Sequence, residues 1–119
     1  MRKKEANVAS NKAYLDFILD QLSSLGGITF RPMMGEYILY YQGKVVGGIY
    51  DDRFLLKPTK NVLRLVEESG MPPAMELPYE GAREMLAPDP DDRERLCELV
   101  RAAAEDLPMP KKKAARGSR

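Results

Sequence analysis

Residues 31–58 read RPMMGEYILYYQGKVVGGIYDDRFLLKP, and this stretch decides the fold. It contains segments rich in Ile, Leu, Val and Tyr, which favour strands, and each segment is followed by turn-forming residues. Gln42-Gly43 and Asp51-Asp52 are short enough for two-residue hairpins, so the stretch predicts an antiparallel four-stranded β-meander. The expected strands cover residues 28–33, 36–41, 44–50 and 53–57.

Regular pairing through these turns predicts which side chains share a face, because directly opposed residues project to the same side of a sheet. Gly47-Gly48 inside a strand indicates a bulge or the close approach of another segment. One face is expected to be apolar except for Glu36 and to hold Ile38, Tyr40, Val45, Gly47, Ile49, Phe54 and Leu56. The opposite face mixes aromatics with cations, as protein interfaces and single-strand nucleic-acid platforms do. Its candidate interaction surface consists of Tyr37, Tyr41, Lys44, Tyr50, Arg53 and Lys57.

Helices are expected before and after the meander. Apolar residues recur at helical spacing in 11–25 and in 60–69. A final helix is expected to begin at Asp89 or Asp91, where Asp91 and Glu94 have capping-box spacing, and to end near Asp106. The Pro-rich residues 71–90 leave room only for short extended pieces, of which 83–87 is the best strand candidate.

The expected architecture is therefore α+β. It consists of an N-terminal helix, the four-stranded meander, a second helix, a short extended Pro-rich segment and a C-terminal helix. Residues 11–107 are expected to form this domain, with a flexible N-terminus at 1–10 and a disordered basic tail at 108–119.

Composition narrows the class of protein. The 119 residues and their 44% hydrophobic content suit one soluble domain. No signal-peptide core or run of about 18 apolar residues appears, and the lone cysteine, Cys97, has no intrachain partner, so a cytoplasmic location is expected. The excess positive charge lies at the two ends, which leaves an acidic body that disfavours nucleic-acid binding. The candidate nucleic-acid contacts are Lys111, Lys112, Lys113 and Arg116 in the tail.

The sequence offers no familiar catalytic group. Histidine is absent, which removes the commonest general base and metal ligand. Cys97 falls on the apolar side of the last expected helix, where burial hides a thiol. The acidic clusters at 51–52 and 89–92 lie where turns and helix caps require Asp. No catalytic residue, cofactor or metal site is therefore expected, and the protein is predicted not to be an enzyme.

Two alternative functions remain open at this point. An enzyme or small-ligand-binding protein of unknown substrate would form its pocket between the sheet and the Pro-rich segment, where Tyr79, Glu80, Arg83 and Glu84 supply polar groups. A weak nucleic-acid binder would combine the basic tail with the candidate interaction surface, and its affinity would fall steeply with salt. Self-association is a further expectation, because an open meander leaves edge strands to be covered.

A further pattern combines Met34-Gly35, Tyr37, Leu39-Tyr40, Gly43, Leu55-Leu56-Lys57, Gly70-Met71-Pro72, Tyr79 and Gly81. This pattern resembles the N-terminal domain of the TfoX/Sxy family, bacterial regulators of competence for natural transformation. The sequence departs from the family pattern at Glu36, where a second Gly is usual, and at 84–88, where the family has an aromatic-containing strand. Longer members add a C-terminal domain similar to a helix-hairpin-helix module, which this chain is expected to lack.

The resemblance implies a non-enzymatic regulatory domain that binds another protein. The longer relatives promote transcription of DNA-uptake genes together with the cyclic-AMP receptor protein. The implied partner is therefore a transcriptional regulator or part of the transcription machinery, while direct DNA contact and a membrane partner are not expected. The resemblance supplies no catalytic residues.

Overall fold

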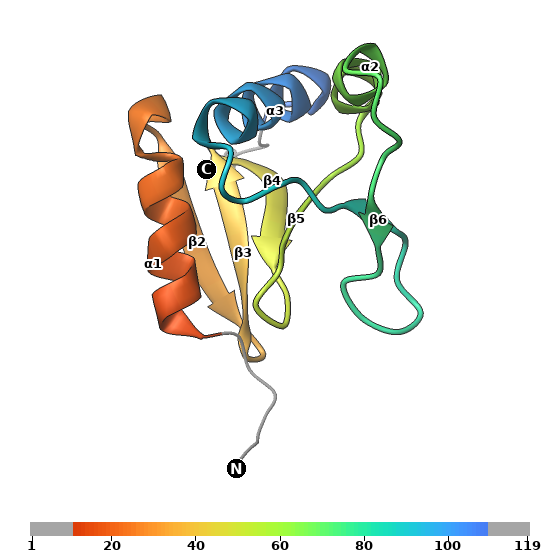
Figure 1. The fold of residues 1–119 in the computed structure, drawn as a ribbon. Coiled ribbons are helices and arrows are strands. Elements are labelled where there is room, and N and C mark those ends of the chain that lie inside the picture. The colour runs from red at the N-terminus through yellow and green to blue at the C-terminus, as the bar shows by residue number, and fades with distance from the viewer. Residues whose placement is uncertain (1–10, 110–119) are drawn as a thin grey trace.

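The computed structural model describes residues 11–109, in which three α-helices and one short 3₁₀ helix accompany a single antiparallel sheet (Figure 1). The helices are α1 (Lys12–Gln21), η1 (Ser23–Leu25), α2 (Lys60–Glu68) and α3 (Arg93–Asp106). The strands are β2 (Ile28–Met33), β3 (Glu36–Tyr41), β4 (Lys44–Ile49), β5 (Phe54–Leu56), β6 (Met75–Glu76) and β7 (Met85–Leu86). The predicted α+β class and the order of its helices are confirmed.

Strands β2 to β5 form the predicted meander through three two-residue turns. Both residues of Met34-Gly35, Gln42-Gly43 and Asp51-Asp52 have positive φ, as type I′ turns require. Tyr50 and Arg53 exchange two backbone hydrogen bonds around Asp51-Asp52, which closes the last of these hairpins. The turn chemistry read from the sequence therefore fixes the chain direction of every strand in the meander.

The sheet contains two short strands besides the four of the meander, and its order is β2-β3-β4-β5-β7-β6. Strand β7 lies inside the predicted segment 83–87, while β6 was not predicted. Each of these strands contributes two residues, and β7 joins β5 only through the pair Leu56–Leu86. A strand as short as β6 carries no readable alternation of apolar and polar residues, so the Pro-rich sequence did not reveal it, whereas β7 confirms the strand candidate at 83–87.

The predicted faces of the meander are wrong because β4 contains a bulge. Tyr40 pairs with Val45, but Leu39 pairs with Gly47, so Val46 is an extra residue without a partner in β3. The extra residue reverses the side on which later side chains project. Ile38, Tyr40 and Val45 therefore lie on one face, whereas Gly47, Ile49, Phe54 and Leu56 lie on the other, together with Tyr37, Leu39 and Tyr41.

The three helices pack into one core with this second face, which we call the helix face. Figure 1 shows α1 alongside β2 and β3, and α3 next to α2 at one end of the sheet. Helices α1 and α3 bury Ile18, Leu96 and Val100 against Leu39 and the other sheet residues of the cluster. The opposite side of the sheet, the outer face, carries none of these helices and projects Ile38, Gly48 and Leu55.

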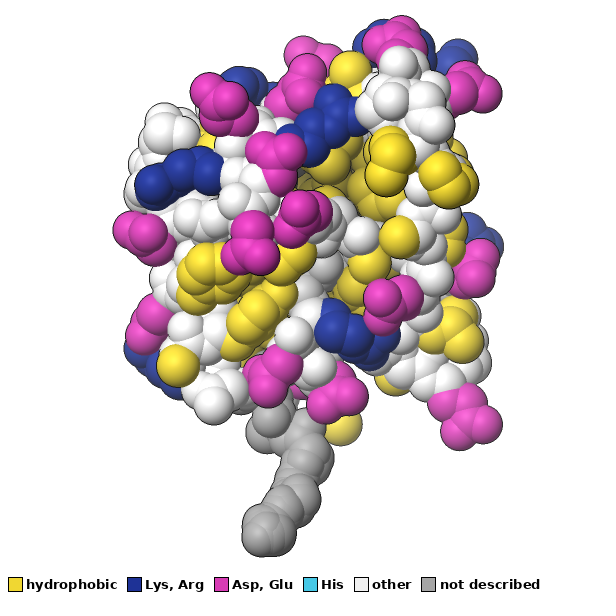
Figure 2. Space-filling view, in the orientation of Figure 1, with side chains coloured by type: hydrophobic (Ala, Val, Ile, Leu, Met, Phe, Trp, Pro, Cys, Tyr) yellow, Lys and Arg dark blue, Asp and Glu magenta, His cyan; other side chains and the backbone are white. Residues whose placement is uncertain are grey.

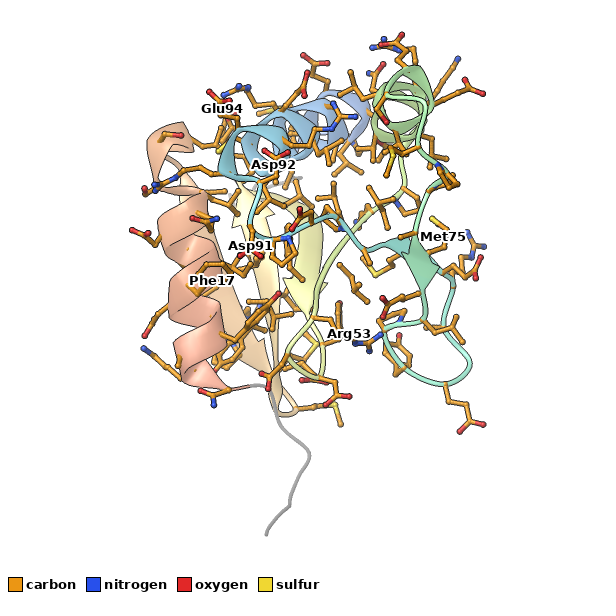
Figure 3. All side chains as sticks on the ribbon, in the orientation of Figure 1. Phe17, Arg53, Met75, Asp91, Asp92 and Glu94 are labelled. Atoms are coloured by element: carbon orange, nitrogen blue, oxygen red, sulfur yellow. The ribbon has the colours of Figure 1, made fainter. Side chains whose placement is uncertain are left out.

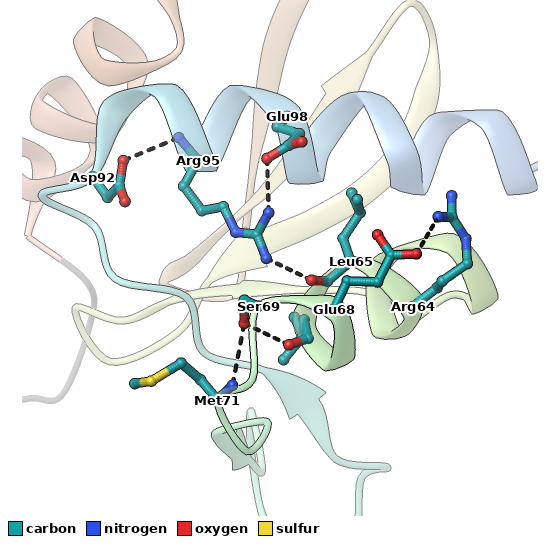
Figure 4. A network of polar contacts seen from close by, with 9 residues as sticks. Arg64, Leu65, Glu68, Ser69, Met71, Asp92, Arg95 and Glu98 are labelled. Atoms are coloured by element: carbon teal, nitrogen blue, oxygen red, sulfur yellow. Dashed lines mark hydrogen bonds and ion pairs between the residues drawn. The ribbon is translucent and has the colours of Figure 1, made fainter.

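A side chain of α3 holds α2 near the C-terminal end of α2. Arg95 donates to the carbonyl oxygen of Leu65 near the C-terminal end of α2 at 2.7 Å and pairs with Glu98 at 2.7 Å (Figure 4). Helix α3 is capped by Asp92, whose carboxylate accepts from the N–H of Arg95 at 3.1 Å, so the predicted cap at Asp89 or Asp91 is wrong by at least one residue. Its end at Asp106 is as predicted.

Candidate functional site

The outer face of the sheet carries the strongest candidate for a functional surface. Tyr50 follows β4, and Tyr79 lies in the loop between β6 and β7, yet their ring centroids are 6.4 Å apart. Tyr79 is 65% exposed although it is a large aromatic side chain. Exposed aromatic residues of this kind are enriched in protein interfaces. We call the residues around this pair, which line two hollows described below, the Tyr50–Tyr79 surface.

Gly48 makes room for the ring of Tyr50. A Cβ atom at Gly48 would lie 2.6 Å from the carbonyl oxygen of Tyr37 and 2.9 Å from the ring and hydroxyl of Tyr50. The ring therefore folds back over its own strand, where a larger residue would exclude it. Gly47 is equally confined by the backbone of β5. The prediction of a bulge or close approach at Gly47-Gly48 is confirmed in both respects.

Arg53 holds the loop that carries Tyr79. Its guanidinium lies between the turn after β4 and the loop after β6 (Figure 3). It donates to Glu76 Oε1 at 2.8 Å and to the carbonyl oxygens of Leu77 and Pro78 at 3.0 and 3.3 Å. Its Nε donates to the carbonyl oxygen of Tyr50 at 3.0 Å, so a single side chain links the segments of both tyrosines. This clamp positions the aromatic pair.

Two hollows flank the tyrosine pair, and both are lined by Tyr50 and Tyr79. The larger, of about 540 Å³, lies between the sheet and the Pro-rich segment, and the smaller has about 380 Å³. Lys57 and Arg83 bring cations to the larger hollow, and Glu84 brings a carboxylate. The other residues of the larger hollow are Pro58, Thr59, Pro78, Ala82 and Met85, and those of the smaller are Met33, Met34, Glu36 and Ile38.

The electrostatics of the surface favour a neutral Tyr50. Burial raises the pKa of the Tyr50 phenol above its ordinary value of 10.0, and the nearby Tyr79 and Glu36 raise it further. The hydroxyl of Tyr50 thus remains a hydrogen-bond donor over the physiological pH range. This surface presents aromatic rings, thioethers and cations, which suits binding of a complementary surface or an anionic group.

The structure divides the predicted candidate interaction surface. Tyr41 is buried in the core and Tyr37 packs against it, while Lys44 donates to the carbonyl oxygen of Ala104 in α3 at 2.9 Å. These three residues therefore lie on the helix face. Arg53 binds atoms of its own chain, and Tyr50 and Lys57 line the larger hollow. The proposed tail contacts at Lys111, Lys112, Lys113 and Arg116 lie outside the described residues.

The pocket anticipated beside the Pro-rich segment exists, and three of its four predicted polar residues line it. They are Tyr79, Arg83 and Glu84, while Glu80 is not part of the lining. The sequence analysis did not identify Met33 and Met34, which line the smaller hollow, as part of a functional surface. An apolar pair at a hairpin tip, where polar residues are usual, could have indicated it, since Met34 is 98% exposed.

The described residues contain no group of three or more His, Cys, Asp or Glu side chains placed to hold a metal ion. Cys97 is buried, as predicted, and its sulfur lies 3.5 Å from the hydroxyl oxygen of Ser24.

No helix within residues 11–109 is long and apolar enough to cross a membrane. The helix side of the molecule shows apolar side chains interspersed with charges of both signs (Figure 2).

These observations define a small α+β protein in which the outer face of the sheet, free of helices within residues 11–109, exposes aromatic side chains. The family model for the TfoX N-terminal domain matches residues 20–107. A curated protein of Spirochaeta aurantia, described as an uncharacterized 12.7 kDa protein in the trpE 5′ region, is 34% identical over 111 residues. That similarity covers 92% of this chain and 93% of the relative. The chain belongs to the TfoX N-terminal domain family.

Proposed function

We propose that this chain is a non-enzymatic regulatory domain that binds another protein through its Tyr50–Tyr79 surface. The observation that carries the proposal is the pair of neighbouring, partly exposed tyrosine rings on the outer face, tilted by 54° to each other and flanked by Met33 and Met34. Tyrosine and methionine supply large, adaptable apolar contacts, and both are enriched in interfaces. Arg53 holds the loop of Tyr79 in place before a partner arrives, which reduces the entropy cost of binding.

The biological setting of this binding is transcriptional regulation of competence in the cytoplasm. Membership of the TfoX N-terminal domain family supports this setting. The partner is then a transcriptional regulator or a component of the transcription machinery. Deleting the gene is expected to change transcription of DNA-uptake genes, and unchanged transcript levels under competence-inducing conditions would contradict this setting.

Affinity capture from the native cell with matched variants tests the binding surface. Tyr79→Ser removes an exposed ring from the outer face, whereas Phe17→Ser removes an exposed ring from α1. A protein captured by the wild type is expected to be lost with Tyr79→Ser and retained with Phe17→Ser. Equal recovery with both variants, each shown to be folded by circular dichroism, would assign the binding to another surface.

A second candidate function is binding of a small anionic molecule in the larger hollow. Lys57 and Arg83 line this hollow together with two tyrosine rings, and its volume of about 540 Å³ is within the range of small-molecule sites. A panel of carboxylates and phosphates should then raise the melting temperature of the wild type. The increase should disappear in Lys57→Gln and Arg83→Gln, and a panel without any effect on the wild type would exclude this function.

A further inference from the structure

Strand β2 is a free edge of the sheet. It pairs with β3 on one side, and within the described residues no strand pairs with its other side. Five of its six residues, from Thr29 to Met33, are exposed, and Phe30 is 41% exposed. An exposed strand of this length presents backbone groups that pair readily with another strand. The sequence of β2 determines which strand fits best.

The pairing with β3 fixes which backbone groups of β2 point outward. Met33 and Glu36 flank a two-residue turn and therefore form a hydrogen-bonded pair, after which such pairs alternate along the ladder. The bond from the N–H of Gln42 to the carbonyl oxygen of Gly27, 2.9 Å long, agrees with this alternation. The N–H and C=O groups of Ile28 and Phe30 thus face the free edge. Pro32 also faces it but has no N–H to donate.

We propose that β2 pairs with β2 of a second copy of this chain, antiparallel, about a two-fold axis at Phe30. In this register the N–H of each Phe30 bonds to the C=O of Phe30 in the other copy. The N–H of Ile28 bonds to the C=O of Pro32 in the other copy. Every outward N–H of both strands is thereby satisfied, and the missing donor of Pro32 leaves only the carbonyl oxygen of Ile28 without a backbone partner.

The side chains suit the same register. Arg31, the one charged residue of β2, lies opposite Thr29 of the second copy rather than opposite the other Arg31. Like charges directly opposed would destabilise the pair, and this register avoids them. The two Phe30 rings lie opposite each other on the helix face, where each already contacts Tyr37 with centroids 5.9 Å apart.

A hollow beside the free edge gives these side chains a place to pack. It has about 500 Å³ and is lined by Leu19, Leu22, Ser23, Gly26, Gly27, Ile28, Thr29 and Phe30. Phe30 and Pro32 of the second copy project toward its apolar wall, because they lie on the helix face.

This proposal is independent of the proposed function. Tyr79 lies in the loop after β6, the strand at the opposite edge of the sheet from β2, and of the β2 residues only Met33, at the end of the strand, shares a hollow with it. Neither Tyr50 nor Tyr79 belongs to the β2 edge, so a dimer formed through β2 leaves both rings open and Tyr79→Ser should not change self-association. Loss of dimerisation and loss of partner capture can therefore be measured separately.

Sedimentation analysis of two variants that place opposite charges at position 29 tests the register. Thr29 is exposed and opposes Arg31 of the second copy, so Thr29→Glu adds two attractive pairs per dimer and Thr29→Lys two repulsive ones. The wild type is expected to reach twice its 13.4 kDa mass as concentration rises. Its dimer should bind about threefold more tightly with Thr29→Glu and about threefold more weakly with Thr29→Lys. A wild type that remains monomeric up to about 1 mM, or two variants with equal affinities, would overturn the proposal.

Cysteine cross-linking supplies a second measurement at the two-fold axis. Hydrogen-bonded antiparallel partners have Cα atoms about 5.5 Å apart, within the span of a disulfide, so Phe30→Cys should cross-link two chains under mild oxidation. In Arg31→Cys the two cysteines are diagonal neighbours about 7–8 Å apart, beyond that span. Cross-linking of Phe30→Cys alone supports the register, and equal or reversed yields overturn it. The native Cys97 is buried and does not compete.

Discussion

The carboxylate of Asp106 accepts hydrogen bonds from the backbone N–H and the side-chain amide of Asn61, at 2.7 and 2.8 Å. Asn61 lies in the first turn of α2, where backbone N–H groups lack partners within the helix. At the other end of α2, Arg95 donates to the carbonyl oxygen of Leu65 at 2.7 Å. Helix α3 thus places an anion at the N-terminus of α2 and a cation near its C-terminus, as the helix dipole favours.

The first prediction concerns the pH dependence of this contact. The hydrogen bonds from the backbone of Asn61 and from Thr59 lower the pKa of Asp106 below its ordinary value of 3.8. The contribution of the carboxylate to stability is therefore complete above about pH 3.8 and is lost as the pH falls through the lower pKa of the folded state. Asp106→Asn removes the titrating group but keeps one acceptor oxygen.

Thermal unfolding of the wild type and Asp106→Asn between pH 7 and pH 2 measures this effect. The wild type should melt at the higher temperature near neutral pH, and the difference should narrow below pH 3.8. Asp16→Asn, in an exposed pair with Lys12 on α1, is the control and should show a smaller difference. A difference in melting temperature between the wild type and Asp106→Asn that stays constant down to pH 2 would contradict this account.

The second prediction concerns the other end of α2. Arg95 is 27% exposed and donates across the interface between α2 and α3, whereas Arg64 is 54% exposed and pairs with Glu68 of its own helix (Figure 4). Arg95→Met should lower the free energy of unfolding by about 1–2 kcal/mol, because the bond to Leu65 has a charged donor and is partly buried. Arg64→Met should cost less than about 0.5 kcal/mol. Urea denaturation of both variants provides the comparison, and equal losses would mean that Arg95 contributes no more than a surface charge.

Much of this fold follows from local sequence patterns. The strands of the meander lie within one residue of their predicted ends, because the turns at Gln42-Gly43 and Asp51-Asp52 have a specific backbone geometry that few residues adopt. Helix α2 was equally predictable from its apolar spacing and its Thr59 cap. These elements depend on near neighbours in the chain, which a sequence displays directly.

The candidate site could be predicted only in part, because it depends on long-range contacts. The extra residue Val46 moves the side chains that follow it to the opposite face of the sheet. Nothing in an apolar run shows which strand residue has no partner in the neighbouring strand. The clamp from Arg53 to the β6–β7 loop joins residues more than 20 positions apart. Arg53 therefore appeared to be a surface cation in the sequence, whereas the structure shows it holding Tyr79 in place.

The third prediction tests this clamp by hydrogen exchange. Arg53→Ala removes the bonds to Glu76, Leu77 and Pro78, so amide exchange in residues 77–84 should accelerate. The side chain is 33% exposed, so global stability should fall by no more than about 1 kcal/mol. Arg64→Ala is the matched control and should leave exchange in 77–84 unchanged. Unaltered exchange in Arg53→Ala would show that packing of the buried Pro78 is sufficient to hold the loop.

The fourth prediction concerns Tyr50 at alkaline pH. Burial, followed by the effects of Tyr79 and Glu36, raises the pKa of Tyr50 above 10.0 in the folded protein. The unfolded state then loses this proton at a lower pH than the folded state, so the contribution of Tyr50 is complete below pH 10 and declines as the pH rises above it.

Spectrophotometric titration of phenolate formation between pH 8 and pH 12 should resolve the late titration of Tyr50. Tyr50→Phe should remove a late component of this titration. Tyr14, whose pKa is also raised by burial, supplies the late component that remains in Tyr50→Phe. If Tyr50→Phe instead removed absorbance that develops below pH 10, the phenol would be hydrated. The account of the outer face as a partly desolvated aromatic surface would then be wrong.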